Sequence, residues 1–142
     1  MRVLGLDYGE ARTGVAVSDL LGLTAQGLES IEHKEGTKKL IQRLREIITE
    51  YQIEKIVIGY PLNMNASSGP RAQKTDAFIK KLKEEFGLEV IKIDERLTTV
   101  AAHRTMTELS IKKKRKKQIV DTISAEYILQ MYLDKAEGMS HT

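Results

Sequence analysis

The sequence predicts an α/β fold in which a mixed five-stranded sheet is flanked by helices. Three strand-like segments follow one another within the first 33 residues, which indicates an antiparallel meander. Beyond residue 36, amphipathic helical stretches alternate with short apolar runs, which is the pattern of parallel βαβ units. With 142 residues the chain is long enough for one domain with a single core. We assign this domain to residues 1–138 and expect a frayed tail at 139–142.

The meander is built around the first apolar run. Residues 3–6 have the length of a buried strand, and Asp7 stands where the run ends. A polar linker with a glycine at each end, residues 9–14, leads to a second apolar run at 15–19, so the two runs can pair as a hairpin. An alternating stretch at 22–32 predicts a third strand at an edge of the sheet.

The remaining elements follow from apolar spacing and from helix boundary signals. Apolar residues three and four positions apart predict amphipathic helices, and short apolar runs predict buried strands. Thr37 and Ser68 are candidate N-caps, and Gly87 is a helix stop. We expect helices at 38–51, 70–86, about 98–109 and 118–135, strands at 53–60 and 88–93, and a polar loop at 63–69.

Charge is distributed unevenly along the chain. The net charge is +3, yet one basic run would leave the remainder at −3 if it were removed. Such a run fits either contact with an anionic partner such as nucleic acid or a solvated charged segment. The run consists of Lys112, Lys113, Lys114, Arg115, Lys116 and Lys117.

Composition excludes several kinds of site. The chain has no cysteine, which excludes disulfides and thiolate metal sites and fits a reducing cytoplasm. It has no apolar span long enough for a transmembrane helix and no signal-peptide pattern at its start. We therefore expect a cytoplasmic protein without a membrane partner, in which any metal is held by oxygen ligands or by histidine.

Acidic residues at three places are poorly explained by packing. Asp7 ends one buried strand, and Asp94 and Glu95 directly follow another. Asp121 shares a helical face with apolar residues, although an acid near a helix start can also simply favour the helix dipole. A buried charge needs a cation, a hydrogen-bond network or water, because leaving it unpaired is costly.

Together these acids indicate phosphoryl chemistry. In a mixed sheet the ends of the parallel strands face one crevice, where Asp7, Glu95 and Asp121 can converge. Three converging carboxylates cannot all stay ionised without a cation, and hard oxygen ligands select Mg²⁺ or Mn²⁺. Two such ions, about 3.5–4 Å apart, would activate a water and stabilise the leaving oxygen of a phosphodiester.

Several motifs occur in an order and spacing typical of one family. They are LDYG at 6–9, RTGVAVSD at 12–19, GYPLN at 59–63, DERLTT at 94–99, and Asp121 with its following apolar pattern. Over nearly its whole length the chain resembles the YqgF family, also called RuvX. These Holliday-junction-resolvase-like proteins are usually described as candidate nucleases for pre-16S ribosomal RNA.

The resemblance implies a ribonuclease H-like fold and a metal site formed by Asp7, Glu95 and Asp121, with Asp94 as a rival to Glu95. The chain departs from better-characterised resolvases of this fold in two respects. It has no acid at the end of strand 53–60, and Ser124 stands where those resolvases can carry another acid. The resemblance therefore implies a leaner set of acids.

Basic side chains are candidates for phosphate contacts. Arg12, Arg71, Arg96 and the basic run could each bind nucleic acid. Arg12 could equally be an ordinary surface residue, and Arg96 could pair with a neighbouring acid. Tyr8 could stack on a base or pack beside the turn that follows it.

The leading hypothesis is a metal-dependent endonuclease of structured nucleic acid that processes the 5′ end of pre-16S rRNA in ribosome biogenesis. One alternative is a Holliday-junction resolvase in DNA recombination and repair. Another is a non-catalytic nucleic-acid-binding factor that uses the basic run. A nucleotide hydrolase is less well supported, because the related sugar kinases clamp a nucleotide between two such domains. A monomer would suffice for trimming RNA, whereas two symmetric cuts in a junction need a homodimer.

Overall fold

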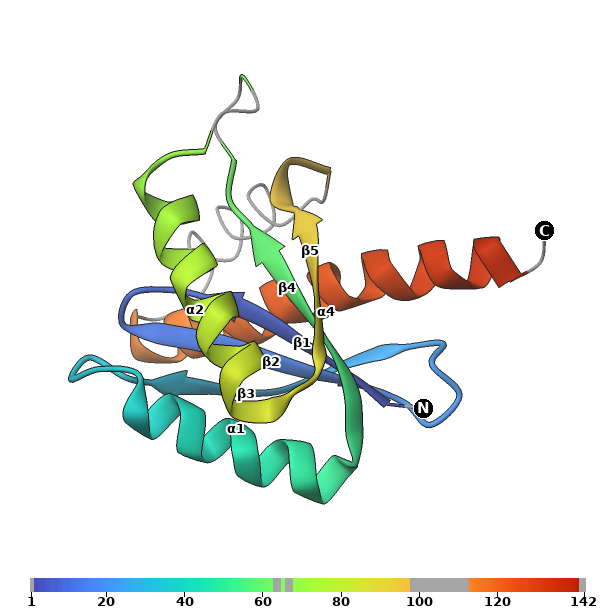
Figure 1. Cartoon of the computed structure of the whole chain (residues 1–142), viewed down its shortest axis with the longest axis horizontal. Helices are drawn as coiled ribbons and strands as arrows, with labels where there is room; N and C mark the ends of the chain where they lie inside the picture. Colours follow the sequence, from blue (N-terminus) through green and yellow to red (C-terminus); the bar gives the residue numbers. More distant parts are fainter. Residues whose placement is uncertain (1, 63–64, 66–67, 98–112, 141–142) are drawn as a thin grey trace.

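A computed structural model describes residues 2–62, 65, 68–97 and 113–140. Five strands form one sheet: β1 (Arg2–Tyr8), β2 (Arg12–Ser18), β3 (Ala25–Glu32), β4 (Ile53–Tyr60) and β5 (Glu89–Asp94). The helices are α1 (Lys38–Tyr51), α2 (Pro70–Phe86) and α4 (Lys113–Ser140), and one 3₁₀ turn, η1 (Glu95–Leu97), follows β5 (Figure 1). The described helices include none that is long and apolar enough to cross a membrane.

The sheet is mixed, and β1 lies at its centre. The strand order is β3-β2-β1-β4-β5. Antiparallel pairs join β1 to β2 and β2 to β3, whereas parallel pairs join β1 to β4 and β4 to β5. This arrangement confirms the predicted meander followed by βαβ units. It also sets the carboxyl ends of β1, β4 and β5 at one edge of the sheet.

Helices cover both faces of the sheet. In Figure 1, α1 and α2 lie in front of the strands and α4 runs behind them. Alternate residues of β1 serve the two layers, because successive side chains of a strand point to opposite faces. Leu4 and Leu6 pack with residues of α1 and α2, whereas Val3 packs with residues of α4 such as Leu129.

Helix α4 crosses the sheet at close range because the strands beneath it carry glycine. A Cβ atom placed on Gly14 would overlap the carbonyl group of Asp121 in α4, and one on Gly5 would lie 2.7 Å from the Cβ atom of Leu129. A glycine inside a strand often marks such an approach. Four strands contribute one glycine each to this contact: Gly5, Gly14, Gly27 and Gly59.

Some predicted boundaries were wrong in the first half of the chain. Strand β3 begins at Ala25 because Gly22, which has a φ of 70°, lies in a turn. The side chain of Asp19 holds this turn by accepting hydrogen bonds from backbone N–H groups. Arg12 already belongs to β2, so the connection between the first two strands is shorter than the glycine positions indicated.

Helix boundaries needed further correction. The N-cap of α2 is Gly69, not Ser68. Thr37 is the N-cap of α1, but its side chain makes no capping hydrogen bond and instead accepts one from Lys81. The predicted start of the last helix at residue 118 was wrong, because α4 begins at Lys113. Lysine and arginine are good helix formers, so all of the basic run from Lys113 onward could join the helix.

The predictions for the last third of the chain concern residues outside the described ranges and the end of the final helix. The predicted helix at 98–109 and Lys112 lie outside the described residues. Helix α4 continues to Ser140, beyond the predicted end at 135. The assignment of 139–142 as a tail stays a prediction.

Candidate active site

Asp7 lies at the centre of the candidate site, near the carboxyl end of β1. It is 5% exposed. The antiparallel register pairs it with Gly14 of β2. Leu6 pairs with Ile58 in the parallel register, so extending that register by one residue places Gly59 of β4 on its other side. Because neither neighbour carries a side chain, other groups can approach Asp7 from both directions.

Asp121 occupies the space above Gly14. Its carbonyl group lies where a Gly14 side chain would begin, and its own side chain is largely buried. The carboxylate accepts two hydrogen bonds on Oδ2, one from Arg12 Nε at 2.8 Å and one from Ser30 Oγ at 2.8 Å. Asp121 lies about two turns inside α4, beyond the first turn in which the helix dipole acts, so the helix-dipole interpretation of this acid loses its basis.

Glu95 occupies the corresponding space above Gly59. A Cβ atom on Gly59 would lie 2.7 Å from Glu95 Oε1 and 2.6 Å from the Cδ1 atom of Ile128 in α4. Both contacts lie on the α4 face of the sheet, which is also the face of Asp7. The three acids that the sequence singled out therefore share one face and one end of the sheet.

Asp94 faces the other way. Ile93 packs in the cluster under α4, so strand alternation directs Asp94 to the opposite face. There Arg96 Nη2 donates to Asp94 Oδ2 at 2.6 Å, and this hydrogen bond lowers the pKa of the Asp94 carboxyl. Arg96 thus pairs with its neighbouring acid, which was one of the two alternatives for this residue. The geometry favours Glu95 over Asp94 as a ligand candidate.

A cleft of about 150 Å³ opens at this end of the sheet. It brings together two of the acids, Asp7 and Asp121, and two of the predicted phosphate-binding residues, Arg12 and Arg71. Its volume is enough for several water molecules. The residues that line it are Asp7, Tyr8, Gly9, Glu10, Ala11, Arg12, Arg71 and Asp121.

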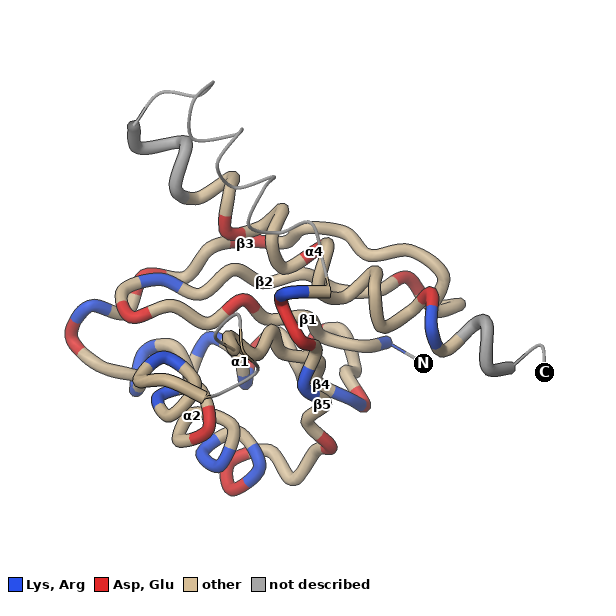
Figure 2. The backbone as a smooth tube through the Cα atoms, turned by 90° about the horizontal axis from the view of Figure 1, so that it is seen from above, with Lys and Arg blue, Asp and Glu red and all other residues tan. Residues whose placement is uncertain are grey.

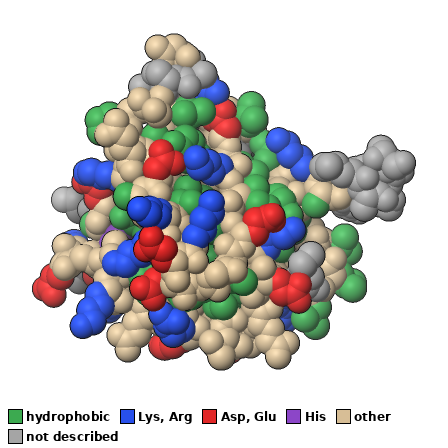
Figure 3. All heavy atoms as spheres, viewed as in Figure 1, with side chains coloured by type: hydrophobic (Ala, Val, Ile, Leu, Met, Phe, Trp, Pro, Cys, Tyr) green, Lys and Arg blue, Asp and Glu red, His purple; other side chains and the backbone are tan. Residues whose placement is uncertain are grey.

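The rim of the cleft carries further charge. Arg71 lies in the first turn of α2, and Lys74 of the same helix pairs with Glu10 of the β1–β2 connection. The Lys74 hydrogen bond lowers the pKa of Glu10. Both α1 and α2 carry basic and acidic residues (Figure 2), and the face in Figure 3 shows the two kinds interspersed. That face therefore offers nucleic acid no continuous basic surface among the described residues.

Most of the basic run forms the start of α4. Lys113 to Lys117 are the first residues of α4, whereas Lys112 precedes the described part of that helix. Contact between the run and nucleic acid therefore stays a prediction.

Tyr8 packs against other rings. Its ring stacks on Phe78 with centroids 4.1 Å apart and lies nearly parallel to His33 at 5.7 Å. Burial raises the pKa of the Tyr8 hydroxyl and lowers the pKa of His33. His33 Nε2 lies 2.8 Å from the Oγ1 atom of the buried Thr13. Packing beside the turn, one of the two alternatives for Tyr8, is what the structure contains.

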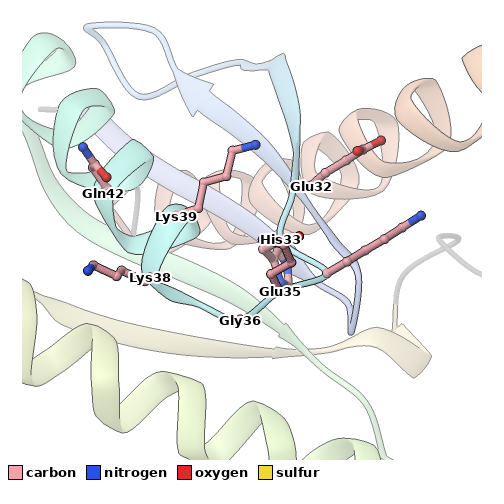
Figure 4. A pocket seen from close by; sticks show the side chains of 8 residues that line it. Glu32, His33, Glu35, Gly36, Lys38, Lys39 and Gln42 are labelled. Atoms are coloured by element: carbon pink, nitrogen blue, oxygen red, sulfur yellow. The ribbon is translucent and has the colours of Figure 1, made fainter.

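A larger pocket, of about 520 Å³, lies where β3 leads into α1 (Figure 4). The close-up shows Lys39 extending along its wall toward Glu32, while Lys38 points to the other side. Glu35 adds a second carboxylate to the lining. The pocket therefore presents both signs of charge, and no motif in the sequence predicted it.

The carboxylate oxygens around Asp7 are of the kind that binds an oxygen-preferring cation, but in this structure the carboxylates lie apart from one another. Carboxylate oxygens are the ligands that Mg²⁺ and Mn²⁺ prefer. Yet no group of three Asp, Glu or His residues within the described ranges is close enough to hold a metal ion. Asp121 is meanwhile paired with Arg12. A metal ion at Asp121 would therefore share this carboxylate with Arg12 or displace it.

Sequence reasoning missed two kinds of functional residue. Ser30 gave no signal, because its contact with Asp121 joins residues that are 91 positions apart. The glycine at the end of the predicted linker, Gly14, allows a backbone to approach closely, but the sequence does not show that this backbone is that of Asp121. A glycine inside an apolar strand pattern is a signal for close approach, and it could have indicated a close contact at Gly14 and at Gly59.

Comparison with known proteins gives sequence relatives over almost the whole chain. The profile of the family described as "RuvX: Holliday junction resolvase" matches residues 1–135. A protein of Ruminiclostridium cellulolyticum is 59% identical over 138 residues, covering 97% of each chain. One of Acetivibrio thermocellus is 51% identical over 135 residues, covering 94% of this chain and 96% of its own. Both carry the name "Putative pre-16S rRNA nuclease".

Solved structures show the same fold at low sequence identity. Thermus thermophilus RuvC, in complex with a Holliday junction substrate, matches with a TM-score of 0.59 and 13% identity over 97% of both chains. The fowlpox virus resolvase, in complex with Holliday junction DNA, matches with a TM-score of 0.57 and 13% identity over 96% of this chain and 99% of its own. These similarities support the ribonuclease H-like fold.

Proposed function

Since the chain belongs to the RuvX family of Holliday junction resolvases, we propose that it is an endonuclease that hydrolyses phosphodiester bonds in structured nucleic acid. The observation that carries this proposal is the position of Asp7 between two glycines, with Asp121 above one of them and Glu95 above the other. We further propose the 5′ end of pre-16S rRNA as the substrate, because the relatives at 59% and 51% identity carry that name. Such an enzyme would work in the cytoplasm.

The proposed reaction depends on divalent cations, Mg²⁺ or Mn²⁺, with Asp7, Glu95 and Asp121 as the residues that would hold them. When bound, a pair of ions would lower the pKa of the attacking water and neutralise the charge on the leaving oxygen. Asp7 is the central ligand in this proposal because it lies between the other two acids. Asp121 and Glu95 would each complete the coordination on one side.

Arg71 and Arg12 would position the substrate. Both line the cleft that contains Asp7, and a phosphate group there would be attracted to their guanidinium groups. Arg71 also lies in the first turn of α2, where the helix dipole favours an anion. The Lys74–Glu10 pair at the rim is neutral overall, so it adds no net positive charge to the cleft.

The test is a cleavage assay with Mg²⁺ and Mn²⁺ supplied separately to the wild-type protein and to the Asp7→Asn variant. The substrates are a pre-16S RNA leader, a four-way DNA junction and linear RNA and DNA controls. We expect the wild-type protein to cut the RNA leader and the variant to lose this cutting. Metal-dependent cleavage at full rate by Asp7→Asn would contradict the proposal.

A second candidate function is junction resolution, which the description of the matching family favours. Cutting of the four-way junction in preference to the RNA leader would support it, and two symmetric cuts would then imply a homodimer. Salt-sensitive binding without any cutting would instead favour a non-catalytic factor that uses Lys112–Lys117.

A further inference from the structure

Arg12 already provides the positive charge beside Asp121 Oδ2. Its Nε atom lies 2.8 Å from Asp121 Oδ2 in an ion pair whose side chains are 26% and 10% exposed. A carboxylate this deeply placed needs a positive partner, and here that partner is a guanidinium. A divalent ion at Asp121 would lie next to Arg12, where the two positive charges repel each other.

Ser30 gives the same carboxylate a second, neutral partner. Its hydroxyl donates to Asp121 Oδ2 at 2.8 Å, and the antiparallel pairing of Ser30 with Gly14 places it directly beneath the helix. Neither hydrogen bond described for Asp121 uses Oδ1. The carboxylate can therefore keep the Ser30 hydrogen bond while it changes its charged partner.

From these contacts we infer that Arg12 is a positioning residue that competes with the divalent cation for Asp121. In the metal-free protein it neutralises the carboxylate and keeps the acids from repelling one another. Metal binding displaces it, and Ser30 holds the orientation of the carboxylate in both states. The inference rests on the proposed function, since it requires Asp121 to be a metal ligand.

Once displaced from Asp121, the Arg12 guanidinium could bind a substrate phosphate. The cleft that Arg12 lines also contains Asp7 and Arg71. A guanidinium released from Asp121 remains attached to β2 at the edge of this cleft, where a substrate phosphate can accept its hydrogen bonds. Arrival of the metal would thus make a phosphate-binding group available, and metal and substrate would bind with positive coupling.

The experiment measures Mn²⁺ binding by titration calorimetry in the absence of nucleic acid, for the wild-type protein, Arg12→Gln and Arg71→Gln. We expect Arg12→Gln to bind Mn²⁺ about five- to tenfold more tightly, because the competitor is gone. Arg71→Gln is the matched control. It removes the same charge from the same cleft without breaking the ion pair to Asp121, and its affinity should change less than about twofold.

Two results of this titration would overturn the inference. If Arg12→Gln binds Mn²⁺ no more tightly than the wild-type protein, Arg12 does not compete with the ion. If Arg71→Gln tightens binding as much as Arg12→Gln, the effect is the overall charge of the cleft and not the contact with Asp121.

Titration of Asp7→Asn separates this inference from the proposed function. Loss of Mn²⁺ binding in Asp7→Asn, with no effect of Arg12→Gln, would leave the proposed metal site standing and remove only the competition. Mn²⁺ binding that Asp7→Asn leaves unchanged would contradict the metal site and the inference together.

A measurement on the wild-type protein covers the possibility that Arg12→Gln fails to fold. The Nε–H group of Arg12 can be followed by NMR during titration with diamagnetic Mg²⁺. We expect its signal to shift and its exchange with water to accelerate as the ion displaces it, while the Arg71 signal changes little. An Arg12 Nε–H signal that stays constant while the backbone amides around Asp7 report binding would refute the competition.

Discussion

At the scale of single residues, the structure separates two acids that are adjacent in the sequence, Asp94 and Glu95, by giving them different surroundings. Asp94 belongs to β5 and pairs with Tyr60, whereas Glu95 begins the 3₁₀ turn that follows. That step along the chain places the Asp94 carboxylate against Arg96 and the Glu95 carboxylate over Gly59. The two acids should therefore contribute very differently to activity.

We predict that Glu95→Gln lowers the cleavage rate by at least roughly 100-fold. Removing a residue that hydrogen-bonds to a metal ligand typically lowers metal affinity or activity by about 10- to 100-fold, and removing the ligand itself should lower it further. Asp94→Asn is the matched variant, and it should retain activity within about threefold, because an exposed ion pair contributes little. Single-turnover rates at saturating Mg²⁺ provide the measurement. The assignment fails if Asp94→Asn is the more damaging change.

The residues of the candidate site differed in how visible they were in the sequence. Asp7 and Asp121 could be singled out because each is a charged residue in an apolar pattern. Asp94 and Glu95 could not be separated, because strand alternation decides between them only when the last residue of β5 is known. The Ser30 and Arg12 contacts to Asp121 could not be foreseen at all, since they depend on the placement of α4 over β2 and β3.

At the scale of elements, the site depends on how closely α4 approaches the sheet. The helix rests on glycines of four strands, and its buried residues Ala125, Ile128 and Leu129 fill the space between them. Asp121 reaches the cleft only because the helix backbone lies directly over Gly14. Stability and site geometry are therefore coupled at this contact.

We predict that Gly14→Ala destabilises the protein by about 3 kcal/mol or more. Overpacking usually costs 1–3 kcal/mol, and here the added methyl group would meet backbone atoms that cannot rotate away. Gly69→Ala is the control, because Gly69 has an extended conformation that alanine also adopts. Urea denaturation followed by circular dichroism would measure both variants. A loss for Gly14→Ala no larger than that of the control would contradict the close approach.

The contact between the end of β3 and the β1–β2 connection makes stability depend on pH. His33 is buried, its backbone N–H donates to the carbonyl of Ala11, and burial lowers the pKa of its ring below the ordinary value of 6.5. The unfolded chain therefore binds a proton at this residue more readily than the folded protein does. It follows that stability is lost as the pH falls below about 6.5 and is unaffected above it.

We predict that His33→Gln reduces this loss. Between pH 7.5 and pH 5.5 the melting temperature of the wild-type protein should fall more than that of the variant, because glutamine does not titrate. Thermal unfolding at a series of pH values would measure the difference. Parallel curves for the two proteins would show that His33 is not responsible.

Element boundaries were predictable where a residue type forces them. Helix α2 was predicted over its full length, because Pro70 can occupy the first turn and Gly87 ends the helix with a φ of 63°. The start of α4 was not predictable in this way. A run of lysines carries no stop signal and no apolar stripe, so its membership of the helix depends on continuation from the residues that follow.

At the scale of the whole molecule, the topology explains why the acids meet. The central position of β1 gives Asp7 a neighbouring strand on each side, one antiparallel and one parallel (Figure 1). The antiparallel neighbour, β2, lies under α4. The parallel neighbour, β4, pairs with β5, which leads to the turn that carries Glu95. The mixed sheet thus brings acids from the beginning, middle and end of the chain to one edge.

The most direct test of this account is a crystal structure of the wild-type protein with Mn²⁺, in which the ion is located by its anomalous scattering. We predict a peak coordinated by the carboxylates of Asp7 and Asp121, with Glu95 turned toward it and Arg12 moved away from Asp121. A protein that binds Mn²⁺ elsewhere, or that keeps the Arg12–Asp121 ion pair intact with no ion at Asp7, would contradict the account.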